Sequence, residues 1–135
     1  MEKLPKIREH MDRHVPTLRP ETDILEAIGF LLKKKVTGAP VMDASGRLVG
    51  IITEKDCLKL VAAGVAGNLP RGSVASFMTP DPMTISPDMD VYYAAGVFLN
   101  NNFRRLPVVE DGKLVGAITR FDILRVIQAN LGASA

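Results

Sequence analysis

The apolar positions of this chain follow two periods, one typical of helices and one typical of short strands. After Thr22 or Asp23, either of which can cap a helix, apolar residues recur at helical spacing and predict a helix. This stripe consists of Ile24, Ile28, Leu31 and Leu32. Residues 39–42 and 48–52 predict the two strands of a hairpin, because the residues between them are typical of a turn. A second helix is expected from about Glu54 to Ala63.

The same order of elements is written twice. The motif Gly-h-h-Thr-x-x-Asp, in which h is apolar, runs from Gly50 to Asp56 and again from Gly116 to Asp122. In both copies a Pro-Val step and a glycine-containing turn precede the motif. The second copy therefore predicts its own helices and strands. They are helices over 90–101 and 121–130 and strands over 106–109 and 114–118.

These elements predict an α+β fold of two β-α-β-β-α repeats, each opened by a short extended piece such as that around Thr17. The repeats are expected over about 7–63 and 74–131, joined by a loop over 64–73 that contains Gly and Pro. A copy of roughly 55 residues is marginal by itself. We therefore expect one domain over residues 1–135, with small mixed sheets flanked by helices and the repeats related by a pseudo-twofold axis.

Composition narrows the class of protein. Hydrophobic residues make up 47% of the 135 residues and charged residues 24%, which predicts a packed core. The net charge of +2 is too small a bias to indicate nucleic acid binding. Cys57 is the single cysteine, so an internal disulfide is impossible. Because no apolar run approaches the roughly 20 residues of a membrane span, we expect a soluble cytoplasmic protein without membrane contact.

The Thr and Asp of the repeated motif have two interpretations. In the first, Thr53 and Thr119 cap the following helices and Asp56 and Asp122 complete capping boxes, which is the commoner role of this spacing. In the second, each pair binds a small molecule. A helix N-terminus favours anions, a threonine hydroxyl can bond a phosphate or a sugar, and a carboxylate can accept two ribose hydroxyls. The glycine that opens each motif would let a ligand approach the strand.

The doubled motif, with its Pro-Val steps and hairpins, resembles a tandem pair of CBS domains, the modules named after cystathionine beta-synthase. The resemblance extends from about Ile7 to Leu131. It implies two units that bind adenosine-containing ligands such as AMP, ADP, ATP or S-adenosylmethionine in clefts between them. It also implies a regulatory role toward an enzyme or transporter, and a homodimer shaped as a flat disc.

Carried over residue by residue, the resemblance implies two crossed clefts. Thr119 and Asp122 would share one cleft with Thr17 and the step from Thr37 to Pro40. Thr53 and Asp56 would share the other with Thr84 and the step from Arg105 to Pro107, where basic residues reach phosphates. The clefts would differ, because the first copy has Thr37-Gly38 where the second has arginines. The ligand-binding candidates are Thr17, Thr37, Gly38, Ala39, Pro40, Thr53, Asp56, Thr84, Arg104, Arg105, Leu106, Pro107, Ile118, Thr119 and Asp122.

Other candidate sites carry less weight. His10 and His14 are four residues apart and could form a metal pair on a helix, but the pattern fixes no third ligand, so no metal site is expected. Cys57 occupies the place of an isoleucine in the second copy and is expected to pack in the core. Of Tyr92 and Tyr93, one ring is expected in the core and one exposed, or else on a dimer surface.

We therefore expect a regulatory sensor of an adenine nucleotide rather than an enzyme, acting as a homodimer on an enzyme or transporter. Because the histidines lie together near the N-terminus, no catalytic residues are proposed. A ligand-free interaction module is the alternative from another class, and a weak nucleic-acid binder is a third. No cofactor beyond an AMP, ADP or ATP ligand is expected.

Overall fold

The computed structural model describes residues 4–64 and 71–132, so most of the predicted loop over 64–73 lies outside the described residues. The chain divides into two compact units. One is formed by residues 16–82, and the other by residues 1–15 together with 83–135. Each unit therefore contains a segment that the sequence repeat assigns to the other copy. The α+β fold with small sheets and flanking helices is confirmed.

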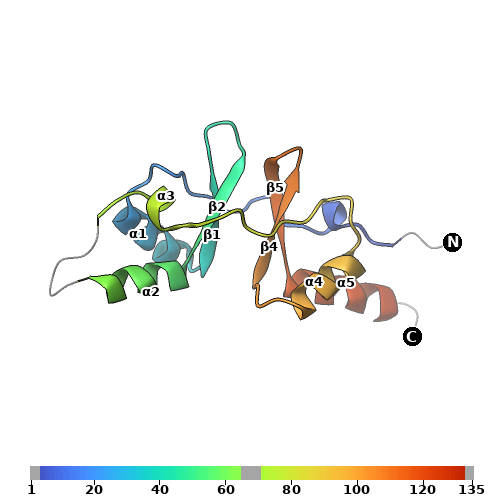
Figure 1. Ribbon diagram of the computed structural model, residues 1–135. Helices are drawn as coiled ribbons and strands as arrows, with labels where there is room; N and C mark the ends of the chain where they lie inside the picture. The colour runs from blue at the N-terminus through green and yellow to red at the C-terminus, as the bar shows by residue number, and fades with distance from the viewer. Residues whose placement is uncertain (1–3, 65–70, 133–135) are drawn as a thin grey trace. The chain divides into compact units, whose positions relative to one another are not determined.

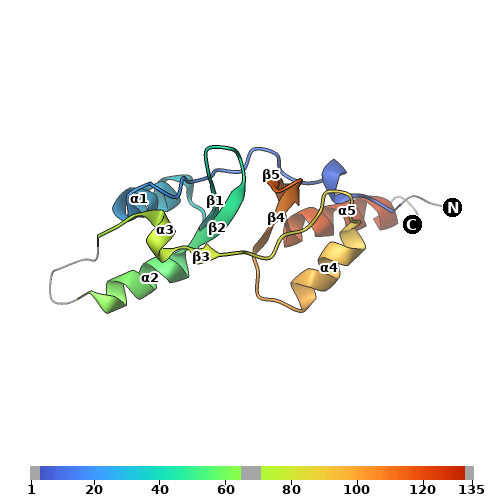
Figure 2. The ribbon, with the colours of Figure 1, turned by 45° about the horizontal axis from the view of Figure 1, so that its top comes forward.

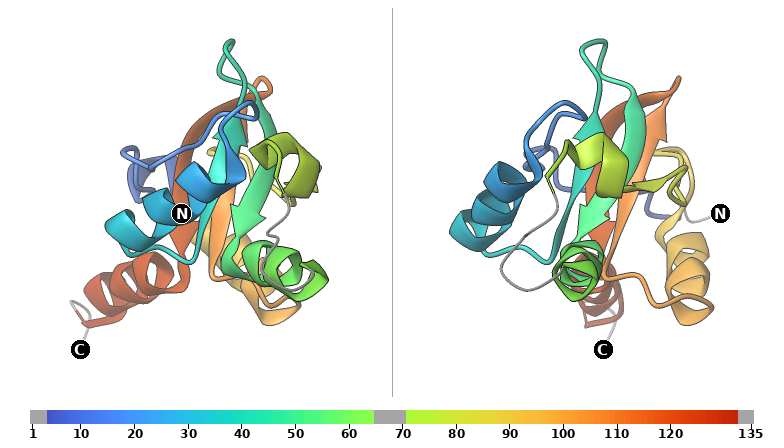
Figure 3. Two further views of the ribbon diagram at one scale, coloured as in Figure 1. Left: turned by 90° about the vertical axis from the view of Figure 1, so that its left-hand side faces the viewer. Right: turned by 60° about the vertical axis from the view of Figure 1, so that its left-hand side comes forward.

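The unit of residues 16–82 is built on a three-stranded antiparallel sheet in the order β1-β2-β3. Leu18 adds a parallel bridge to Val41, which gives this sheet its mixed character. The helices lie on one face of the β1–β2 hairpin (Figures 1 and 3). The strands are β1 (Gly38–Met42), β2 (Leu48–Thr53) and β3 (Thr79–Pro80), and the helices are α1 (Ile24–Lys34), α2 (Glu54–Ala63) and α3 (Val74–Phe77).

Helix α1 begins where the sequence predicts, and three residues of its predicted apolar stripe, Ile24, Ile28 and Leu31, face the core. The carboxylate of Asp23 accepts a hydrogen bond from the N–H of Leu25 at 3.0 Å and caps the helix. The buried residues are Ile24, Ala27 and Leu31. Leu32 is 74% exposed, so its predicted place in the apolar stripe is wrong. Each residue turns the helix by about 100°, which carries Leu32 away from the face that Leu31 buries.

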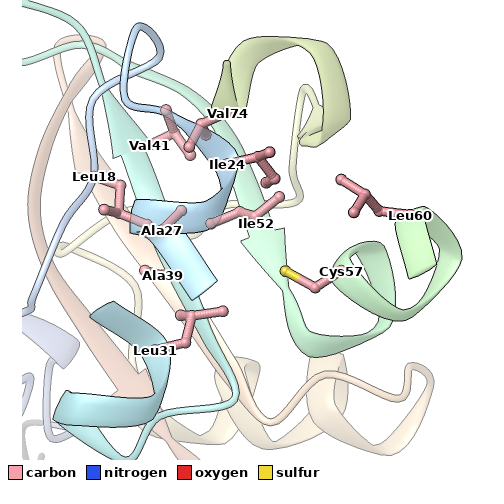
Figure 4. Close-up of a cluster of buried hydrophobic side chains, with 10 residues drawn as sticks. All are labelled: Leu18, Ile24, Ala27, Leu31, Ala39, Val41, Ile52, Cys57, Leu60 and Val74. Atoms are coloured by element: carbon pink, nitrogen blue, oxygen red, sulfur yellow. The ribbon is translucent and has the colours of Figure 1, made fainter. Parts of the chain in front are cut away.

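The core of this unit consists of small and branched apolar side chains between the hairpin and the helices (Figure 4). Val41 and Ile52 are fully buried on the sheet, and each such side chain contributes about 1.5–3 kcal/mol to stability. Cys57 on α2 belongs to this cluster, as predicted, and burial raises the pKa of its thiol. Its buried members are aliphatic apart from Cys57, and the aromatic side chains of Phe30 and Phe77 pack against it while only partly buried.

The second unit has a two-stranded antiparallel sheet, with its helices packed beside it (Figure 2). Its elements are η1 (Ile7–Glu9), α4 (Val91–Leu99), β4 (Arg105–Glu110), β5 (Lys113–Thr119) and α5 (Arg120–Gly132). Isolated bridges extend the sheet, one from Asp12 to Ala117 and one from Ile85 to Val108. Within the described residues, no helix combines the length and the apolar character that crossing a membrane requires.

The expectation that one ring of Tyr92 and Tyr93 lies in the core is wrong. The two residues are 51% and 52% exposed, because α4 turns Val91, Ala94 and Phe98 into the core instead, and their alternative place on a dimer surface stays a prediction. His10 and His14 do not share a helix, since η1 ends at Glu9. Within the described residues, no group of three or more His, Cys, Asp or Glu side chains is placed to hold a metal ion.

The N-terminal segment is fastened to the second unit by a buried side chain and an ion pair network. Ile7 is fully buried, and its N–H donates to the carbonyl of Met89 at 2.9 Å. The guanidinium of Arg8 binds Asp88 at 3.0 Å and also pairs with the carboxylate of Glu110. The hydrogen bond from Arg8 holds the pKa of the Glu110 carboxyl below its ordinary value.

The glycine that opens each repeated motif makes room for the chain itself. A Cβ atom on Gly50 would lie 2.5 Å from the sulfur of Met78. A Cβ atom on Gly116 would lie 2.7 Å from the carbonyl oxygen of Asp12. The prediction that these glycines admit a ligand is therefore wrong. Each glycine instead leaves room for a segment of its own unit, around Met78 at Gly50 and around Met11 at Gly116. That segment pairs with the strand that contains the glycine.

Candidate functional site

The first Thr-Asp corner lies where β2 ends and α2 begins. Oγ1 of Thr53 accepts a hydrogen bond from the N–H of Asp56 at 3.2 Å. The N–H of Thr53 in turn donates to Oδ2 of Asp56 at 3.0 Å. These reciprocal bonds form a capping box, so the capping interpretation is confirmed here. The carbonyl of Thr37 accepts the N–H of Glu54 at 2.8 Å and satisfies a further amide at this helix end.

A third residue, Thr79, also bonds the Asp56 carboxylate. The hydroxyl of Thr79 on β3 donates to Oδ1 of Asp56 at 3.2 Å. Both oxygens of this carboxylate are thus bonded to the chain itself. Asp56 is 8% exposed, and among the described residues it is the one buried polar or charged side chain. Burying a carboxylate is costly unless hydrogen bonds compensate it, and Thr53 and Thr79 supply them.

The second corner lies at the junction of β5 and α5. The N–H of Thr119 donates to Oδ2 of Asp122 at 2.8 Å. The N–H of Asp122 donates to Oγ1 of Thr119 at 3.2 Å, which repeats the capping geometry of the first corner. Oδ1 of Asp122 is paired with Arg125 one turn along the helix. The Arg125 side chain is 68% exposed, so this oxygen is held by a solvent-facing group.

A hollow of about 190 Å³ opens beside Asp122. It is lined by His10, Asp122, Arg125, Val126 and Ala129. A carboxylate, a guanidinium and an imidazole thus border the same space, over the apolar surface of α5. Such a set can accept hydroxyl groups at the carboxylate and attract an anion to the arginine.

Two polar residues of this hollow, Arg125 and His10, were missed as ligand candidates. Arg125 lies three residues after Asp122, and helical spacing alone could have placed both on one side of α5. His10 was weighed only as a metal ligand. The N-terminal segment brings it next to α5, and the sequence around it holds no local signal for that neighbourhood.

Arg105, the predicted phosphate ligand, lies on β4 directly opposite Thr119 on β5. Its Nη1 atom is buried and has no hydrogen-bond partner within the described residues. A buried N–H group without a partner is costly, so this nitrogen is a ready donor for an anion. Arg104, the neighbouring candidate, is exposed. The hairpin thus brings one arginine, Thr119 and Asp122 into a single unit.

The remaining candidates lie on or near the hairpins. Gly38 is paired with Thr53 across β1 and β2, as Arg105 is with Thr119 across β4 and β5. Five candidates are buried and lie on the strands of their own units. They are Ala39, Pro40, Leu106, Pro107 and Ile118. Thr17 is half-buried just before the parallel bridge at Leu18, and Thr84 is exposed. The roles of these residues toward a ligand stay predictions.

Comparisons with known proteins agree on one family. The family model described as CBS domain matches residues 7–63 and 74–129. The protein MJ1225 of Methanocaldococcus jannaschii is 35% identical over 121 residues, which are 90% of this chain and 42% of that protein. The chain spans between 15% and 58% of the length of four curated relatives that it matches.

Two solved structures are similar in fold and were determined with ligands. The crystal structure of CBSX2 in complex with AMP, a protein of Arabidopsis thaliana, is 31% identical with a TM-score of 0.81 and covers 93% of this chain and 97% of its own. The CBS domain pair of protein MJ0100 was solved with 5-methylthioadenosine and S-adenosyl-L-methionine. It is 27% identical with a TM-score of 0.77 and covers 95% of this chain and 99% of its own.

Proposed function

The chain belongs to the CBS domain family, and on that premise we propose that it is a regulatory module that binds an adenine nucleotide. The solved relatives named above hold AMP, 5-methylthioadenosine and S-adenosyl-L-methionine, which share the adenosyl group. The observation that carries the proposal for this chain is the Thr119–Asp122 corner. There a carboxylate borders an open hollow, and a buried unpaired arginine nitrogen lies on the neighbouring strand.

The proposed roles follow from the donors and acceptors of this corner. Asp122 accepts the two hydroxyls of the ribose, because an ionised carboxylate can only accept hydrogen bonds. Arg105 donates its unpaired N–H to a phosphate oxygen. A phosphate therefore adds affinity, and AMP, ADP and ATP are favoured over the cationic S-adenosylmethionine.

The proposed mechanism is linkage between the ligand and a partner surface. A ligand that binds one arrangement of the repeats more tightly shifts the population toward it, and so changes the surface offered to a partner protein. We propose that the chain acts in this way as a homodimer in the cytoplasm, on an enzyme or transporter that is a separate chain, with no catalysis of its own.

Thermal unfolding with a panel of ligands tests the proposal. A ligand at about 100 times its Kd adds about 2.7 kcal/mol, which raises the melting temperature of a chain of this size by roughly 10 °C. We expect such a rise with AMP, ADP or ATP. Cytidine monophosphate, with the same ribose and phosphate, is the matched control and should produce a much smaller rise. Equal shifts with both nucleotides would contradict recognition of adenine.

A second candidate function is a ligand-free interaction module. It is favoured by one observation, that both capping boxes are complete without any ligand. In that case none of the nucleotides raises the melting temperature. Asp56→Ala and Asp122→Ala then lower stability without changing any ligand response.

A further inference from the structure

We propose that the chain binds a single ligand, held by Asp122, and that Asp56 is a structural carboxylate that takes no ligand. The inference rests on the proposed function and names which of the two corners performs it. The ligand class is a nucleotide whose ribose reaches Asp122 and whose phosphate, assigned above to Arg105, also meets Arg125. The sequence predicts that the two clefts differ, because Thr37-Gly38 stands where the second copy has arginines, but it does not decide which of them is occupied.

The first step in the argument is the engagement of Asp56. Thr53 bonds Oδ2, and the hydroxyl of Thr79 bonds Oδ1. The backbone of Thr79 is held beside this corner, because β3 is paired with β2 through Thr79 and Ile51. A ribose at Asp56 would have to break the Thr79 bond and leave that hydroxyl to find another partner.

The second step is what stands at the corresponding place in the other unit. Met11-Asp12 corresponds to Met78-Thr79 in the repeat. Each pair lies next to the glycine that opens the motif of its unit. Asp12 is fixed there, since its N–H donates to the carbonyl of Ala117 at 2.9 Å. Its carboxylate accepts the N–H of His14 at 2.9 Å, and when ionised it has no proton to donate to Asp122. Within the described residues, Asp122 therefore lacks a hydrogen bond of the kind that the Thr79 hydroxyl donates to Asp56.

The third step concerns Arg125, which pairs with Oδ1 of Asp122. The Arg125 side chain is 68% exposed, so water can solvate its guanidinium when it leaves Asp122. A ribose hydroxyl that takes its place at Asp122 releases the guanidinium into the hollow that His10 also lines. There it can meet the anionic group of the same ligand.

Isothermal titration calorimetry with AMP tests the assignment on the full chain and on Asp122→Asn and Asp56→Asn. Asparagine keeps an oxygen that accepts the capping N–H, so both variants should fold, which circular dichroism and urea unfolding check. We expect one AMP per chain. Asp122→Asn should weaken binding by about tenfold or more, because it removes an acceptor for a ribose hydroxyl. Asp56→Asn should leave affinity and stoichiometry unchanged.

Arg125→Gln tests whether the anionic group and the ribose of the ligand are bound by different residues. It should weaken AMP several-fold and leave adenosine unchanged, and an equal loss for both ligands would overturn the role of Arg125. Two AMP per chain, or a loss in Asp56→Asn that matches that in Asp122→Asn, overturns the single-site inference and leaves the proposed function standing. Absence of binding of AMP, adenosine and S-adenosylmethionine by the unaltered chain overturns the proposed function and this inference with it.

Discussion

Thr79 and Asp56 lie 23 residues apart in the chain, and the hydroxyl of one donates to the carboxylate of the other at 3.2 Å. The bond joins β3 to the first turn of α2 and helps to satisfy a buried carboxylate. In the second unit Asp12 stands at the corresponding position, and the matching carboxylate of Asp122 is paired with an exposed arginine instead. The residue beside each strand, Thr79 in one unit and Asp12 in the other, is thus one of the differences between two corners that share the same motif.

Loss of the Thr79 hydroxyl should destabilise the chain. Thr79→Val keeps the shape of the side chain and removes its donor, which should lower the free energy of unfolding by about 1 kcal/mol. Thr84→Val, at an exposed threonine near the start of the second unit, is the matched control and should change stability little. Urea unfolding measures both. Equal stability of the two variants would show that the Thr79–Asp56 bond contributes nothing.

The capping box of α5 should be measurable in the same way. Thr119→Ala removes the oxygen that accepts the N–H of Asp122, and the free energy of unfolding should fall by about 0.5–2 kcal/mol. Thr119→Ser keeps that oxygen and should retain most of the stability. A serine variant as unstable as the alanine variant would assign the loss to packing of the methyl group rather than to capping.

A methyl group on Gly116 should be poorly tolerated, because the carbonyl of Asp12 would lie 2.7 Å from it and backbone must shift. We expect Gly116→Ala to destabilise the chain by about 1–3 kcal/mol. Gly29→Ala is the control, since a Cβ there meets nothing within 4 Å. That substitution lies inside α1 and should stabilise by up to about 1 kcal/mol. The two changes in urea unfolding should therefore have opposite signs.

Stability should depend on the ionisation of Glu110. Arg8 lowers the pKa of this carboxyl in the folded chain, so the unfolded chain takes up the proton first as pH falls. The contribution is present above the unfolded pKa and is lost as pH drops through the lowered folded pKa. Arg8→Gln should therefore be less stable than the unaltered chain near neutral pH, with the difference shrinking in acid. A difference that stays constant down to low pH would contradict the linkage.

Cys57 should react slowly with thiol reagents. Burial raises the pKa of its thiol, and the residue is 8% exposed, so the reactive thiolate is both scarce and shielded. Labelling with Ellman's reagent should be slow in the folded chain and rapid in denaturant. Because the neutral thiol is favoured in the fold, this group opposes unfolding below its ordinary pKa, and that contribution is lost as pH rises through the raised pKa. Fast labelling of the folded chain would contradict the packing role.

The sequence by itself determined the features that depend on near neighbours. The repeat, the α+β class, the order of the longer helices and strands and both capping boxes follow from spacings of a few residues, where local periodicity and helix capping decide the backbone. For the same reason the helix ends differed from prediction by only a residue or two at α4 and α5. The short elements η1, α3 and β3 were not predicted. The exposure of Leu32 and of the Tyr92–Tyr93 pair was missed, because propensity does not say which side of a helix meets the core.

Only the tertiary structure decided what lies beside each motif. Met11 and Met78 fill the space at the glycines, Thr79 reaches Asp56, and His10 comes to lie near Asp122, each through contacts between segments far apart in the chain. Such contacts depend on how strands pair and which segment completes which unit, and no local spacing encodes them. The sequence therefore predicts two Thr-Asp corners in clefts that differ, and long-range packing decides which side chains contact each carboxylate.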